Sequence, residues 1–74
     1  MEVKAGQIYK HFKGNTYRVI AIAKSCEDLS LQVVYQDTED EHKIWVRSYE
    51  EFISPVDKEK YPNINQEYRF TLVN

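Results

Sequence analysis

The chain has few of the residues that build a covalently held or metal-held scaffold. Its 74 residues include a single cysteine, Cys26, so no internal disulfide can form. It has only two glycines and two prolines, and no repeat or low-complexity tract is visible. No stretch approaches the roughly 20 apolar residues that a membrane helix needs, and the first ten residues lack the apolar run of a signal peptide. We therefore expect one small cytoplasmic domain over residues 1–74, without a membrane partner.

A strong charge of either sign is also absent. The net charge of -2 argues against a generic DNA-binding protein, because such proteins usually carry a basic footprint. The charges are unevenly distributed, however: basic residues dominate from Glu2 to Lys24, and acidic residues dominate from Glu27 to Glu59. A local basic face on an acidic protein is therefore compatible with the sequence, and net charge alone does not decide the partner.

Aromatic residues are what the chain has in quantity. It contains six tyrosines, three phenylalanines and one tryptophan, and each ring buries a large apolar area from one chain position. Beta-branched and aromatic residues gather in short runs between polar clusters, a pattern typical of strands. The runs predict five strands, and the residues from Lys13 to Thr16 favour a tight turn between the first two. The expected strands are Gln7–Phe12, Tyr17–Lys24, Ser30–Gln36, Lys43–Arg47 and Tyr68–Val73.

The connections complete the predicted fold. Ser48 followed by Glu51 is a capping-box pattern, which predicts a helical turn between the fourth and fifth strands. The stretch from Asp37 to Glu41 indicates a solvated loop, whereas part of Ser54 to Glu67 should pack, because so long a structureless loop is unusual. A flat sheet of this size would leave an apolar face and two edges open. We therefore predict an all-β fold, a small five-stranded SH3-like barrel with one short helical turn.

Several sequence blocks carry a family resemblance. They are Tyr9-x-His11-Phe12-Lys13-Gly14 and Tyr17-x-Val19 at the first hairpin, Val33-Val34-Tyr35-Gln36, Trp45-Val46-Arg47, Phe52, and Arg69-Phe70. In order and spacing they resemble the family known as domain of unknown function 1653, over nearly the whole chain. The resemblance implies a small bacterial or phage-borne protein whose fold is compatible with the barrel, and it implies no established activity.

The chain departs from that family at two positions. Family members often carry a histidine where this chain has Ser25, and a proline where it has Ser48. If the histidine were catalytic in its relatives, this protein would lack the activity. The segment from Asp57 to Gln66 is also longer than usual for the family.

Signals for metal binding and catalysis are weak. The good nitrogen and sulfur donors are His11, Cys26 and His42, without the CxxC or HxxxH spacing of metal sites. Two acidic residues follow Cys26, and such a setting does not favour a reactive thiolate. The acidic stretch from Asp37 to Glu41 lacks the glycine and the spacing of a calcium loop. We therefore expect no catalytic residues, no metal and no cofactor.

The first strand presents an aromatic and basic face. Side chains alternate along a strand, so Tyr9, His11 and Lys13 are expected to lie on one face. A face that buries itself in a core does not need a histidine and a lysine. We therefore regard these three residues as candidates for ligand binding. For His11 the alternative interpretation, a hydrogen-bonded strand histidine without a binding role, is favoured.

The fourth strand carries the other half of the candidate surface. We expect Ile44 and Val46 to face the core, which leaves Trp45 and Arg47 on the opposite side. Trp45 can pack beneath the stems of its charged neighbours or serve as a stacking platform. Burial is the favoured interpretation, because a small barrel relies on its large rings for packing. Arg47 can equally pair with an acid of the helical turn.

Together these residues lead to a functional hypothesis. The ligand-binding candidates are Tyr9, His11, Lys13, Tyr35, Trp45 and Arg47. We expect a non-enzymatic binding module for a protein or nucleic-acid partner, an expectation that rests partly on fold analogy. The alternative is a protein of phage origin that sequesters a small anionic, nucleotide-like ligand in a pocket between protomers. A monomer and a homo-oligomer are both compatible with the sequence.

Overall fold

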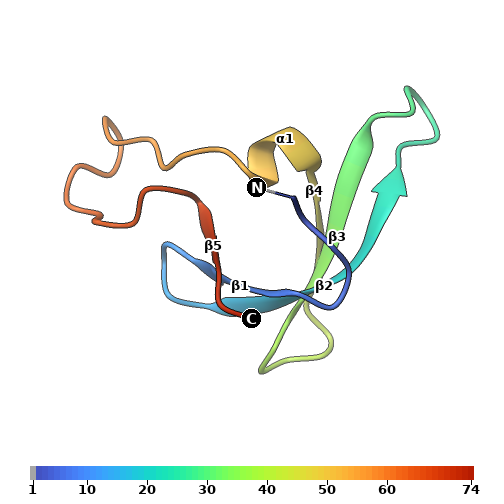
Figure 1. Ribbon diagram of the computed structural model, residues 1–74, viewed down its shortest axis with the longest axis horizontal. Coiled ribbons are helices and arrows are strands. Elements are labelled where there is room, and N and C mark those ends of the chain that lie inside the picture. Colours follow the sequence, from blue (N-terminus) through green and yellow to red (C-terminus); the bar gives the residue numbers. More distant parts are fainter. Residues whose placement is uncertain (1) are drawn as a thin grey trace.

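The computed structural model describes residues 2–74 and consists of five antiparallel strands and one short helix (Figure 1). The elements are β1 (Ile8–His11), β2 (Thr16–Lys24), β3 (Leu31–Asp37), β4 (Ile44–Ser48), α1 (Tyr49–Phe52) and β5 (Phe70–Leu72). The all-β class and the helical turn between the fourth and fifth strands are confirmed. The strand bounds differ from the predicted ones by one or two residues.

The five strands form one sheet in the order β4-β3-β2-β1-β5. The predicted closed barrel is not confirmed, because β4 and β5 are the two edges of an open sheet across residues 2–74. The sheet is nevertheless strongly bent: β2 begins beside β1, and its second half rises steeply beside β3 (Figure 1). The register shift between Val19 and Ala21 marks a bulge at Ile20, and a bulge bends the strand that carries it.

The first hairpin turns where the sequence predicts a turn. The Gly14 N–H donates to the His11 carbonyl at 2.9 Å, and the His11 N–H donates to the Asn15 carbonyl at 2.8 Å. Gly14 has a φ of 109°, a region that side chains with a Cβ rarely adopt. The turn therefore depends on glycine at this position, and it places His11 at the end of β1.

Helix α1 begins at the predicted cap. The Ser48 side chain accepts a hydrogen bond from the Glu51 N–H at 3.2 Å, which satisfies one of the free donors of the first turn. The four-residue helix directs Phe52 into the core, where it is fully buried. Within residues 2–74, no helix has the length and apolar character needed to cross a membrane.

The long connection from α1 to β5 is partly packed, as expected. Val56 is buried, and its N–H donates to the Glu67 carbonyl at 2.9 Å. Next to this pair, Pro55 and Tyr68 form an isolated antiparallel bridge. The two ends of the connection therefore lie side by side, and the residues between them extend away from the sheet (Figure 1).

The core is built mainly from aromatic rings. Phe52 and Phe70 stack with their centroids 4.0 Å apart, and Tyr9 meets Phe52 edge-on at 5.2 Å. Tyr9 is only 1% exposed, and its hydroxyl donates to Gln7 Oε1 at 2.9 Å. Burial, followed by the proximity of Tyr49, raises the pKa of Tyr9. Its assignment to a ligand-binding surface was therefore wrong, because a side chain this deeply buried cannot contact a ligand.

The predicted orientation of β4 was also wrong. Ile44 and Val46, expected in the core, are 56% and 64% exposed. Trp45 and Arg47 lie directly opposite Tyr35 and Val33 of β3. Residues opposite each other in an antiparallel pair share a face, so Trp45 and Arg47 share the core-facing side of the sheet.

Candidate functional site

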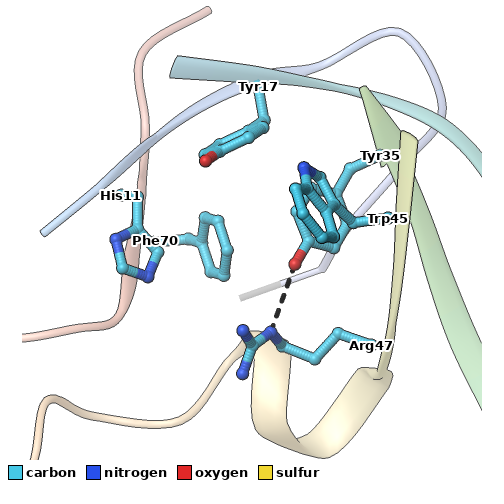
Figure 2. Close-up of a pocket in the computed structure, with 6 residues that line it drawn as sticks. All are labelled: His11, Tyr17, Tyr35, Trp45, Arg47 and Phe70. Carbon is cyan, nitrogen blue, oxygen red and sulfur yellow. Dashed lines mark hydrogen bonds between the residues drawn. The ribbon is translucent and has the colours of Figure 1, made fainter. Parts of the chain in front are cut away.

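An open pocket of about 190 Å³ lies on the core-facing side of the sheet (Figure 2). Each of the five strands contributes to its lining, with β4 on one side and β1 and β5 on the other. The lining residues are His11, Tyr17, Tyr35, Trp45, Arg47 and Phe70. The fold thus brings together four of the six residues proposed from sequence, although they come from three different strands.

The floor of the pocket is a cluster of interlocking rings. Phe70 is fully buried and Tyr35 is 5% exposed, with ring centroids 5.4 Å apart in an edge-to-face arrangement. Tyr17 meets Tyr35 edge-on at 5.3 Å and Phe70 at 6.0 Å. Edge-to-face packing is a favoured geometry for aromatic pairs. These contacts place Phe70 and Tyr35 in the core beneath the pocket, and the partly buried Tyr17 is the ring of this cluster that keeps exposed surface.

Trp45 forms an open wall of the pocket. It is 50% exposed, and no aromatic ring within residues 2–74 pairs with it, in contrast to the rings of the floor. The sequence favoured a structural role for this ring, and its half exposure shows that packing covers only part of it. A half-exposed indole at the rim of a pocket offers a face on which another planar group can stack.

Arg47 is held at the side of the pocket by several contacts. Its Nε donates to the Tyr35 hydroxyl oxygen at 3.3 Å, as the dashed line in Figure 2 shows. Its Nη1 lies 3.6 Å from Glu51 Oε2, one helical turn along the chain. The guanidinium carbon is 6.0 Å from the centre of the Phe70 ring. The pairing with an acid of the helical turn, which the sequence left as one of two alternatives, is present, and the guanidinium keeps donors that these partners do not use.

His11 is a neutral group at the opposite side of the pocket. Its Nδ1 accepts a hydrogen bond from the Lys13 N–H at 3.1 Å, which confirms the prediction of a hydrogen-bonded histidine. Desolvation, followed by the charges of Arg47, Arg69 and Lys13, lowers its pKa to about 4. Near neutral pH the imidazole is therefore uncharged. With Nδ1 occupied as an acceptor, its proton lies on Nε2, which is a donor.

One of the sequence candidates, Lys13, lies outside this pocket. Its side chain is exposed, and Nζ lies 5.9 Å from the Phe12 ring centre and 5.7 Å from that of Tyr61. Its charge still reaches the pocket, since it contributes to the lowered pKa of His11.

Sequence reasoning missed two of the lining residues, Tyr17 and Phe70. Both belong to the sequence blocks that carried the family resemblance, which was one available signal. The strand register was a second signal, because it places Tyr17 opposite Tyr9 in the hairpin and Phe70 opposite His11 between β1 and β5. Neither register is visible until the strands are paired.

The lining residues are aromatic or basic. They include no thiol and no carboxylate, and Cys26 is exposed at a turn outside the pocket. Within residues 2–74, no three His, Cys, Asp or Glu side chains are grouped closely enough to hold a metal ion. An apolar cavity of roughly 150 Å³ can hold a benzene ring, so a pocket of about 190 Å³ can accept one planar ring.

Comparison with known proteins places the chain in a family without assigning it an activity. No curated protein and no solved structure matches the chain. One family matches over residues 7–72, which include all five strands, α1 and every residue of the pocket. The chain belongs to this family, described as "Protein of unknown function (DUF1653)".

Proposed function

We propose that this protein is a non-enzymatic binding module whose pocket holds one nucleotide unit. In this proposal the base stacks on Trp45 and the phosphate lies at Arg47. One observation carries it: a half-exposed tryptophan without a ring partner in the described chain stands two residues from an arginine that its neighbours hold in place.

Local charge supports an anionic ligand. Arg47 lines the pocket, and after desolvation the charges of Arg47, Arg69 and Lys13 lower the pKa of His11, so three cations lie near the pocket although the protein has a net charge of -2. An aromatic pocket without these cations would equally suit an ammonium group. Here a cationic ligand would be repelled, whereas a phosphate would find a guanidinium with unused donors.

The shape and polarity of the pocket support a heterocyclic ring. The floor and one wall are aromatic, and the volume of about 190 Å³ matches a single ring system. The neutral His11 supplies a donor at Nε2, which can meet an acceptor on the edge of a base. Stacking provides sequence-tolerant affinity, because every base has a π-face.

The single tryptophan of the chain provides a direct test. Trp45 fluorescence is recorded while the protein is titrated with the four nucleoside monophosphates and with short single-stranded DNA and RNA. We expect saturable quenching, since a stacked base covers the exposed indole. Turnover of the nucleotide would contradict the non-enzymatic part of the proposal.

Two variants make the test specific for the pocket. Arg47→Ala should weaken binding by about tenfold or more, because a charge-assisted contact contributes at least ~1.4 kcal/mol. Lys24→Ala, which removes an exposed cation at the far end of β2, serves as the matched control. Equal affinities of the wild type and Arg47→Ala, or no quenching by any nucleotide at millimolar concentration, would contradict the proposal.

A further inference from the structure

A second group of rings and cations adjoins the pocket. This outer cluster consists of Phe12, Lys13, Lys60 and Tyr61. None of the four residues lines the pocket. We infer that the ligand is single-stranded nucleic acid, with one base in the pocket and the neighbouring nucleotides on the outer cluster. This inference rests on the proposed function and specifies its ligand class.

The outer cluster and the pocket form one continuous series of rings. From the pocket floor, Phe70 meets His11 edge-on at 4.9 Å. His11 in turn stacks on Phe12 at 4.4 Å with an angle of 30° between the rings. Phe12 then lies 4.9 Å from Tyr61. His11 therefore belongs to both groups, and a chain that leaves the pocket past His11 reaches the outer cluster directly.

The cations of the outer cluster lie close to its rings. Lys13 Nζ is 5.9 Å from the Phe12 ring centre and 5.7 Å from that of Tyr61, and Lys60 Nζ is 5.5 Å from the Tyr61 centre. Both lysines are exposed, and neither forms an ion pair with an acid of residues 2–74. Their charges are therefore available to phosphate groups. Aromatic platforms beside free cations are the arrangement by which proteins bind single strands.

Hydrogen bonds fix the C-terminal end of the long connection against the first hairpin, and Tyr61 reaches the hairpin through its ring contact with Phe12. Gln66 Nε2 donates to the Lys10 carbonyl at 3.1 Å and to the Tyr68 carbonyl at 2.8 Å. The Phe12 N–H donates to the Arg69 carbonyl at 3.0 Å. The long connection between α1 and β5 thus serves to place a ring and a cation next to the first hairpin. A pocket for a free nucleotide would not need this extension.

The geometry also favours a single strand over a duplex. The pocket of about 190 Å³ has room for a single base, and a base inside a duplex is stacked and paired and cannot enter it. Binding of a duplex would require the base to be extruded, which costs unstacking and unpairing energy. The local positive charge attracts the phosphate backbone of a single strand and of a duplex alike. The preference for a single strand must therefore come from the pocket.

The test compares thymidine monophosphate with a ten-nucleotide oligothymidylate and a ten-base-pair duplex, with Trp45 fluorescence as the readout. We expect the oligonucleotide to bind the wild type at least about tenfold more tightly than the mononucleotide. Tyr61→Ala should lower the ratio of these two affinities, because a stacking platform outside the pocket is lost. Arg47→Ala should weaken the binding of both ligands.

Substitutions of exposed lysines provide an independent measurement, because they should leave the fold intact. Lys60→Gln should reduce the slope of log affinity against log salt for the oligonucleotide by about 0.7, the value for one phosphate contact on a single strand. Lys24→Gln makes the same charge change outside both groups of rings and should leave the slope unchanged. Circular dichroism confirms that Tyr61→Ala is folded before its affinity is interpreted.

The outcomes separate the two proposals. An oligonucleotide that binds no more tightly than the mononucleotide would overturn the inference and leave the proposed function standing. A duplex that binds as tightly as the single strand would also overturn it, as would equal salt slopes for the wild type and Lys60→Gln. Failure of every ligand to bind would contradict the proposed function itself.

Discussion

Arg47 Nε donates a hydrogen bond to the Tyr35 hydroxyl oxygen at 3.3 Å, between neighbouring strands on the core-facing side of the sheet. Tyr35 is almost fully buried, so its hydroxyl is a fixed point from which the guanidinium is oriented. A second nitrogen of the guanidinium, Nη1, lies 3.6 Å from Glu51 Oε2. The cation of the pocket is therefore positioned before any ligand arrives, and this reduces the ordering cost of binding.

Tyr35→Phe tests this relationship. The substitution removes the acceptor of Arg47 and should lower the free energy of unfolding by about 0.5–1.5 kcal/mol. It should also weaken nucleotide binding several-fold, because Arg47 loses one of the contacts that orient it. Urea denaturation and Trp45 fluorescence titration measure the two effects. Tyr17→Phe is the stability control, since the Tyr17 hydroxyl makes no hydrogen bond within residues 2–74, and equal unfolding energies for the two variants would count against a structural role of the bond.

Trp45→Ala separates a ligand platform from a core residue. Removal of a buried tryptophan costs about 3–5 kcal/mol, but Trp45 is 50% exposed, so the variant should lose well under that amount and remain folded. Its affinity for the oligonucleotide should fall by about 1–3 kcal/mol, the contribution of one stacked base. Thermal melts by circular dichroism and NMR titrations check the two results. Trp45→Phe retains a ring and should recover part of the affinity, whereas an unfolded Trp45→Ala protein would show that the ring is structural.

The lowered pKa of His11 predicts a pH dependence of stability. In the folded protein the pKa is about 4, against an ordinary value of 6.5. As the pH falls from 6.5 to 4, the unfolded chain binds a proton that the folded protein excludes, so the free energy of unfolding decreases. The ring is partly exposed to solvent, which reduces the expected loss to about 1 kcal/mol.

His11→Asn isolates this effect from the titration of carboxylates. Asparagine keeps an acceptor for the Lys13 N–H but has no proton to bind in this range. The unfolding energy of the variant should therefore decrease less than that of the wild type between pH 6.5 and pH 4. Urea denaturation at several pH values measures the difference. Parallel curves for the two proteins would show that His11 keeps an ordinary pKa.

A pair of identical substitutions tests the orientation of the sheet. Val33 is fully buried on the core-facing side, whereas Val46 is 64% exposed on the other side. Val33→Thr places an unpaired hydroxyl in the core and should cost about 1–3 kcal/mol. Val46→Thr should change the unfolding energy by less than about 0.5 kcal/mol. Similar losses for the two variants in urea denaturation would contradict the orientation of β4.

The sequence by itself determined the local elements of this protein. Short runs of beta-branched and aromatic residues between polar clusters located five strands to within two residues, because such runs are a signal within a few residues of the chain. Gly14 fixed the first turn through its positive φ, and Ser48 fixed the start of α1 through a hydrogen bond three residues along the chain. These features depend on backbone geometry within a few residues, so no tertiary information is needed to predict them.

The tertiary structure alone decided which side of each strand is buried. Side chains alternate between the two faces of a strand, so the sequence shows that Trp45 and Arg47 share a face of the sheet. The alternation does not show whether that face is turned toward the core. The apolar character of Ile44 and Val46 suggested the wrong face, because an edge strand can leave apolar side chains exposed.

The pocket and the outer cluster were likewise decided by tertiary structure. Tyr9, from the same alternating face as His11, became part of the core because Phe52 packs against it from α1. Phe70 and Tyr61 joined the aromatic series only when the chain returned to the first hairpin, 59 residues after His11 and 49 residues after Phe12 respectively. Contacts at such separations depend on how the whole chain packs, and the local sequence does not encode them.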